Sequence, residues 1–148
     1  MSPKSSEFFK PVELISDGKA GDAFDRAKKA ITTSVGDKVF DDLKGITSEE
    51  EQKISTIRVT AQKAEATFVA KIQQSGRESP EGLEYFRGMI SNKVLKLTAL
   101  LLIMESDIEK NGSTHVSSDT PDEVKKLLNK NISLDKAAAG QTQKGVDG

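Results

Sequence analysis

The sequence predicts an all-α protein: a helical bundle built on a long antiparallel helix hairpin (about 48–74 and 80–110), with shorter flanking helices. Large apolar residues recur at steps of three and four between Leu83 and Ile108, which is the helical period. Three positions combine a good N-cap residue with residues that favour a helix start. Aromatic residues make up only 5% of the chain, and no segment alternates apolar with polar residues as a half-buried strand does.

The N-terminal part of the chain predicts short elements. Residues 1–18 are expected to form a mobile segment, in which Phe8 and Phe9 are an apolar pair that docks either on the core or on another molecule. Residues 21–35 predict a helix, and 37–44 predict one or two further turns unless the two pieces form one kinked helix. The apolar face of the first helix comprises Phe24, Ala27, Ile31 and Val35.

The first hairpin helix, 48–74, begins with the spacing of a capping box. Thr47 pairs with Glu50 in one register, and Ser48 pairs with Glu51 in the other. The apolar residues mostly alternate steps of three and four, the rhythm of a helix that is paired along its length. They are Ile54, Ile57, Ala61, Ala64, Phe68 and Ile72. Because this seam is narrow and rich in alanine, a partner helix can approach closely.

The second hairpin helix is the most apolar part of the chain. Ser79 suits its N-cap, and Pro80 suits its first turn. Gly82 and Gly88 each weaken the helix by about 1 kcal/mol relative to alanine, so we expect them to mark a close helix contact or a hinge. Between residues 94 and 104 the helix is apolar most of the way round, and something must therefore cover it.

The C-terminal part predicts one more helix and a tail. Thr120-Pro121-Asp122-Glu123 is a good helix start, and the helix is expected to end at about Asn131. We place a disordered tail at 132–148, because its Ala, Gly, Gln and Lys residues offer little to bury. A single helical domain is therefore expected at 19–131.

Composition and motifs argue against several classes of function. The chain has no cysteine, which removes disulfides, thiol catalysis and cysteine-based zinc sites. Its net charge of −1 argues against nucleic-acid binding, which needs a cationic surface. We find no calcium-loop or phosphate-loop motif and expect no metal and no cofactor. His115 is the only histidine and lies in a polar loop, so we expect it to be exposed and the protein not to be an enzyme.

The sequence also bears on location. The first residues contain no apolar run of the kind that forms a secretory signal peptide. The fully apolar part of the second hairpin helix is far shorter than the ~20 residues that span a bilayer. We therefore expect a soluble protein with no membrane span, either cytoplasmic or exported by a route that needs no signal peptide.

Apolar surface is what remains to carry function. Either the other helices complete a closed core around the second hairpin helix, or one face stays uncovered and associates. The sequence therefore predicts a non-enzymatic helical protein that acts by self-association, as a homo-oligomer, or by binding a protein partner. A small helical adaptor or chaperone that binds one partner protein is the alternative. The candidate interaction residues are Phe8, Phe9, Phe86, Leu95 and Leu102.

One segment resembles a known family. Ser79-Pro80-Glu81-Gly82-Leu83-Glu84-Tyr85-Phe86, followed by Ile90-Ser91, is similar to the turn and second helix of the small needle and inner-rod subunits of bacterial type III secretion systems. The likeness covers about residues 64–103. It implies a structural subunit of a secretion apparatus that polymerises through 83–108. The chain departs from that pattern because it continues to residue 148 after the second helix.

Overall fold

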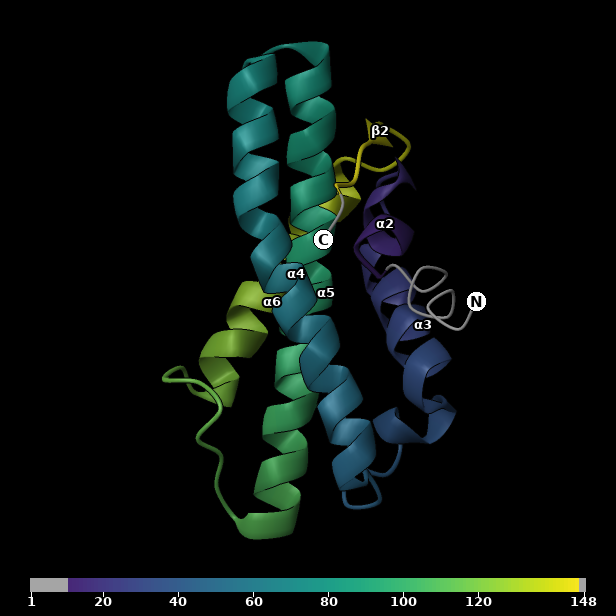
Figure 1. Ribbon diagram of the computed structural model, residues 1–148, viewed down its shortest axis with the longest axis vertical. Helices are drawn as coiled ribbons and strands as arrows, with labels where there is room; N and C mark the ends of the chain where they lie inside the picture. Colours follow the sequence, from purple (N-terminus) through teal and green to yellow (C-terminus); the bar gives the residue numbers. More distant parts are fainter. Residues whose placement is uncertain (1–10, 147–148) are drawn as a thin grey trace, which may run out of the picture.

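The computed structural model describes residues 11–146, apart from the side chains of Glu13 and Leu14. The helices are α2 (Pro11–Ser16), α3 (Ala23–Val35), α4 (Ser48–Ser75), α5 (Pro80–Asn111) and α6 (Pro121–Ala137), with the 3-10 helix η1 (Asp37–Phe40) after α3. The two-residue strands β1 (Gly18–Lys19) and β2 (Thr142–Gln143) pair antiparallel. The all-α class and the long hairpin, formed by α4 and α5, are confirmed (Figure 1).

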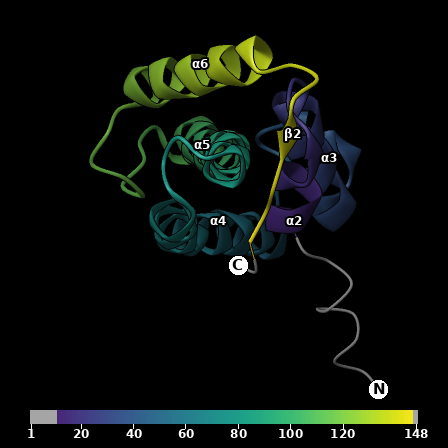
Figure 2. The same cartoon turned by 90° about the horizontal axis from the view of Figure 1, so that it is seen from above.

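Helix α5 lies at the centre of the molecule. Figure 2 shows α4 on one side of it, α6 on the opposite side, and α2 with α3 on a third. The sequence accounts for this position, because the middle of α5 is apolar around most of its circumference and needs cover on several sides. Val94, Leu95 and Met104 are fully buried there. For this part of α5, the closed core is the outcome that the structure shows.

The long helices begin where the capping patterns predict. The backbone N–H of Glu50 donates to Thr47 Oγ1 at 3.1 Å, and the N–H of Thr47 donates to Glu50 Oε1 at 2.9 Å. This reciprocal pair is a capping box, and it selects the first of the two registers that the sequence allowed. Thr120 and Glu123 form the same pair ahead of α6, and the hydroxyl of Ser79 caps α5.

The two glycines at the start of α5 mark close contacts, but the nearest atoms belong to a turn and to the C-terminal segment and not to another helix. A Cβ atom at Gly82 would collide with the carbonyl of Gly76 in the hairpin turn. A Cβ atom at Gly88 would collide with the carbonyl of Lys144, which lies far away in the sequence. Neither glycine acts as a hinge in the structure, since α5 runs without a break from Pro80 to Asn111.

Several predicted boundaries are wrong. Segment 11–16 is helical, with Val12 and Ile15 buried, so the expected mobile segment does not extend to residue 18. The 37–44 turns are shorter than predicted, and the regular part is η1 alone. Helix α6 continues to Ala137 instead of ending near Asn131.

The disordered tail predicted at 132–148 is a further correction. Residues 138–146 follow α6 in a turn and an extended segment that lies along α2 and α5. Asp135 and Gln143 are buried, and so is Val146. The composition of this region gave no sign of order, because its polar side chains are held by partners from distant parts of the chain. No helix in the described range 11–146 combines the length and apolarity needed to cross a membrane.

Candidate interaction surface

The hairpin of α4 and α5 projects beyond the other elements at the end where its two helices join (Figure 1). Three large apolar side chains are exposed on this projecting part. Leu83 and Phe86 of α5 are 41% and 42% exposed, and Val69 of α4 is 44% exposed. We call these three residues the hairpin patch. Leu83 and Phe86 are one helical turn apart, so they are neighbours on the surface of α5.

An ion pair shows which side of the hairpin the patch occupies. Glu65 of α4 and Lys96 of α5 pair across that side. Val69 lies one helical turn from Glu65, toward the joined end of the hairpin. Two turns from Lys96 in the same direction lies Met89, and Phe86 follows one turn later. Phe86 lies about 80° round α5 from Lys96, so Val69 and Phe86 are exposed on neighbouring parts of the hairpin surface.

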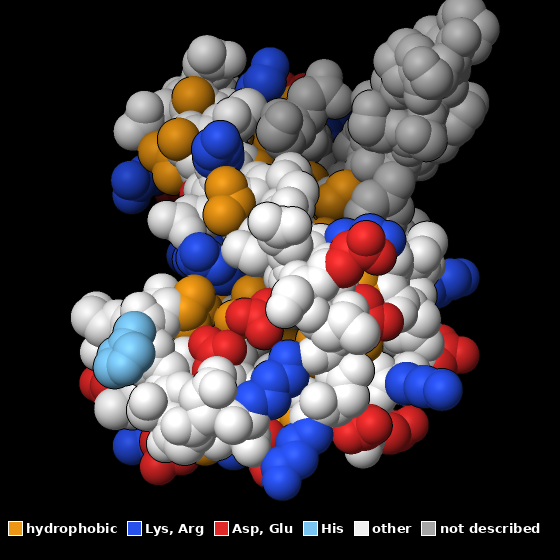
Figure 3. All heavy atoms as spheres, turned by 60° about the horizontal axis from the view of Figure 1, so that its bottom comes forward, with side chains coloured by type: hydrophobic (Ala, Val, Ile, Leu, Met, Phe, Trp, Pro, Cys, Tyr) orange, Lys and Arg blue, Asp and Glu red, His pale blue; other side chains and the backbone are white. Residues whose placement is uncertain are grey.

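Figure 3 shows hydrophobic side chains gathered at the upper left of the molecule, above a recess. His115 lies on the lower side of that recess and is exposed, in the segment between α5 and α6. Figure 2 shows that, among the described elements, no further helix packs on the side of α4 and α5 that faces away from α2 and α3.

The charged groups near the joined end lie on a different side of α5. Glu81 accepts from Lys144 Nζ at 2.9 Å and from Ser75 Oγ at 2.9 Å. The bond from Lys144 and then the bond from Ser75 lower the pKa of Glu81, and the bond to Glu81 raises the pKa of Lys144. Glu81 and Phe86 are five positions apart, about 140° round the helix. The hairpin patch is therefore separate from this ion pair.

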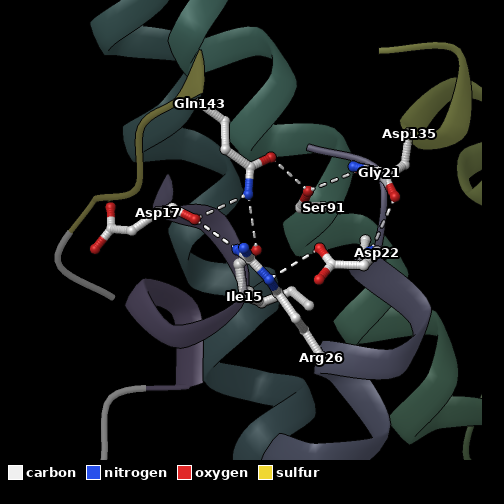
Figure 4. Close-up of polar contacts among 9 residues, drawn as sticks. Ile15, Asp17, Gly21, Asp22, Arg26, Ser91, Asp135 and Gln143 are labelled. Atoms are coloured by element: carbon white, nitrogen blue, oxygen red, sulfur yellow. Dashed lines mark hydrogen bonds and ion pairs between the residues drawn. The ribbon is translucent and has the colours of Figure 1, made fainter. Parts of the chain in front are cut away.

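A second set of polar side chains holds the N-terminal and C-terminal segments against α5 (Figure 4). Asp135 accepts from the backbone N–H groups of Gly21 and Ala23, each at 2.9 Å. Ser91 Oγ lies 2.7 Å from Gln143 Oε1 and 3.4 Å from Asp135 Oδ1. A hydroxyl has one proton, so the shorter contact takes it. These groups satisfy one another, and their arrangement accounts for the order of residues 138–146.

A comparison with known families covers nearly all of the described structure. Residues 11–147 match the family model of DUF8454, a domain of unknown function. The chain belongs to the DUF8454 family. No curated protein and no solved structure matches it significantly. The DUF8454 match includes the segment that follows α6, which the sequence interpretation had assigned to a tail.

The DUF8454 fold separates the interaction residues predicted from sequence. Phe86 is exposed in the hairpin patch. Leu95 and Leu102 are buried in the core of this DUF8454 chain, at 0% and 4% exposure, so they are not available to a partner. Phe8 and Phe9 lie outside the described residues.

Sequence reasoning missed two members of the hairpin patch. Leu83 was counted on the apolar stripe of its helix but not named among the interaction residues, and Val69 was not singled out. The only signal that could have found them was their place near the joined end of the DUF8454 hairpin, where fewer elements are available to cover them. Among residues 11–146, no group of three or more His, Asp or Glu side chains is arranged to hold a metal ion.

Proposed function

We propose that this DUF8454 protein is a non-enzymatic helical protein that acts by self-association or protein–protein binding through the hairpin patch. The observation that carries the proposal is the joint exposure of Val69, Leu83 and Phe86 on the projecting part of the hairpin. Single exposed apolar residues need no explanation, but neighbouring ones on two adjacent helices mark a surface that a second molecule can cover.

The size of the patch sets the strength of the expected association. Full burial of a valine, leucine or phenylalanine side chain is worth about 1.5–3 kcal/mol. Burying the remaining two-fifths of three such side chains therefore contributes about 2–4 kcal/mol. Association also costs translational and rotational freedom, so the patch alone supports only a weak and reversible complex. We therefore expect association that depends on protein concentration.

The test is the solution mass of the full chain over a wide concentration range, measured by size-exclusion chromatography with light scattering. The wild-type mass should rise with concentration, and Leu83→Glu with Phe86→Glu should abolish the rise. The matched control is Ile108→Glu, because Ile108 is 38% exposed on the same helix at its opposite end. Ile108→Glu should leave the association unchanged.

Other results would redirect the proposal. A strict monomer at every concentration would refute self-association and leave the small adaptor or chaperone, which binds one partner protein, as the form of the proposal to test. The secretion-apparatus subunit implied by the resemblance is the polymeric form, and it requires masses that grow well beyond a dimer. Equal loss of association in the patch variant and the control would assign the effect to net charge.

A further inference from the structure

Residues 142–146, which we call the clasp, lie extended against α2 and α5 (Figure 2), and we call the surface that they cover there the groove. The clasp is Thr142-Gln143-Lys144-Gly145-Val146. Each of its five residues has a defined partner in the groove. This is the arrangement of a peptide in a peptide-binding site, except that the peptide belongs to the same chain.

Gln143 is the most specific of these contacts. Its side chain is 3% exposed, and its amide Nε2 donates to the carbonyl oxygens of Ile15 at 3.1 Å and Asp17 at 3.2 Å (Figure 4). Its Oε1 accepts from Ser91 Oγ at 2.7 Å. The groove therefore offers two acceptors to an amide nitrogen and a hydroxyl to the amide oxygen. A carboxylate in place of the amide would have no proton to donate to the two carbonyls.

Lys144 is recognised by charge. Its Nζ lies 2.9 Å from Glu81 Oε2 and 3.7 Å from Glu84 Oε1, and 5.5 Å from the centre of the Tyr85 ring. Its backbone N–H donates to the carbonyl of Glu84 at 3.0 Å. Two carboxylates and an aromatic ring form a site that suits a cationic side chain.

The rest of the clasp is held by backbone and apolar contacts. The N–H of Gly145 donates to Asp17 Oδ1 at 3.0 Å, and Arg87 Nε donates to the carbonyl of Thr142 at 2.8 Å. Val146 packs in a small apolar cluster with Val12, Ala64 and Phe68. The missing side chain of Gly88 leaves room for the backbone of the clasp to lie directly against α5.

The clasp should open far more easily than the protein unfolds. Val146 is its only buried apolar side chain, and the ion pairs of Lys144 are exposed. Exposed ion pairs contribute little to stability, and segments with few buried apolar contacts open locally at low free energy. The large apolar cluster around α5 contains no residue of the clasp, so it stays intact when the clasp leaves.

We propose that the groove between α2 and α5 is a peptide-binding site that the clasp occupies in cis. Its ligand in trans is an extended segment of a partner protein with glutamine, lysine, glycine and an aliphatic residue at successive positions. A partner that carries this pattern displaces the clasp and takes over its contacts. This site is distinct from the hairpin patch, and its test does not depend on self-association through that patch.

The test uses the full chain with Gln143→Ala and Val146→Asp, which weaken the clasp and leave the groove residues unchanged. A fluorescent peptide with the sequence of residues 140–146 is added, and binding is followed by anisotropy. The peptide should bind this variant saturably. It should bind the wild-type chain at least about tenfold more weakly, because a tethered segment competes at an effective concentration on the order of millimolar.

A charge exchange supplies the matched control. A peptide with glutamate at the Lys144 position should bind the variant chain up to about fivefold more weakly than the original peptide. Adding Glu81→Lys and Glu84→Lys to that chain should reverse the preference. A surface that binds peptides non-specifically would not show this reversal of preference.

Amide exchange at Lys144 and Gly145 reports whether the clasp has opened. Faster exchange with no saturable peptide binding would overturn the proposal, and so would substitutions that fail to speed the exchange. Equal binding of the two peptides would also overturn it. If the solution mass doubles when the variant is mixed with the wild-type chain, the ligand in trans is a second copy of this chain and not a different protein.

Discussion

The two halves of α5 lie in different surroundings although they belong to one unbroken helix. Between residues 94 and 104 nearly every position is buried, including Leu95 and Leu102. Between residues 80 and 90 the helix alternates buried positions with exposed ones, and Leu83 and Phe86 are among the exposed. The difference comes from the neighbours, because α3 and α6 pack on the first region, whereas α4, α2 and the clasp contact the second and leave Leu83 and Phe86 exposed.

This contrast shows what an apolar stripe can and cannot establish. The helical period predicts which side chains share a face, but the number of elements around that face decides which of them are buried. The same residue type therefore stabilises the fold at one position and offers a surface at another. Substitutions in the two regions should separate these roles.

The largest expected effect is in the enclosed region. Leu95→Ala and Leu102→Ala should each lower the free energy of unfolding by about 2–5 kcal/mol, because each leaves a cavity in a packed core. Leu83→Ala should cost well under half of that, since much of its side chain already faces water. Urea denaturation followed by circular dichroism measures all three. Similar losses at Leu83 and Leu95 would remove the distinction between the two halves.

A smaller and more local effect is expected at Gly88. In an exposed helix, glycine to alanine is favourable by about 0.5–1 kcal/mol. Here the new Cβ would meet the Lys144 carbonyl and would lie 3.2 Å from Phe68 Cε1. We expect Gly88→Ala to cost about 1–3 kcal/mol and to speed amide exchange in the clasp.

The control for Gly88 is a double-mutant cycle. In a chain whose clasp is already weakened by Gln143→Ala and Val146→Asp, Gly88→Ala should cost less than it does alone. An unchanged cost would mean that Phe68, and not the clasp, is what excludes a side chain at this position.

The sequence predicted the parts of the fold that depend on local chemistry. Thr47 with Glu50 and Thr120 with Glu123 marked helix starts, because capping is complete within four residues. The hairpin itself followed from apolar spacing and the Ser79-Pro80 turn.

The clasp could not be predicted in the same way. Gln143 is held by Ile15, Asp17 and Ser91, and such pairings between distant segments leave no trace in local composition. The same limit applies to the predicted interaction residues, whose burial depends on distant segments of the chain. Phe86 and Leu95 look equivalent in sequence, and only the arrangement of α3 and α6 shows that Leu95 belongs to the core.

The smallest expected effect is the change with pH in how often the clasp opens. The pKa of Glu81 is lowered from its ordinary 4.5, first by the hydrogen bond from Lys144. The pKa of Lys144 is raised from 10.5, first by the same bond. A lowered carboxyl pKa contributes stability above 4.5 that disappears as the pH falls through the folded-state pKa. A raised lysine pKa contributes stability below 10.5 that disappears as the pH rises through its folded-state pKa.

The closed clasp should therefore be insensitive to pH between these limits and should open more often outside them. Amide exchange of Gly145, corrected for its intrinsic pH dependence, measures this opening. Glu81→Gln should abolish most of the acid-side change and weaken the alkaline one, leaving the part that Lys144 owes to Glu84. Because the Lys144 pairs are exposed, raising the salt concentration should shrink the effect in wild type and not in Glu81→Gln. An acid-side opening that persists unchanged in Glu81→Gln would show that the Glu81–Lys144 pair is not its cause.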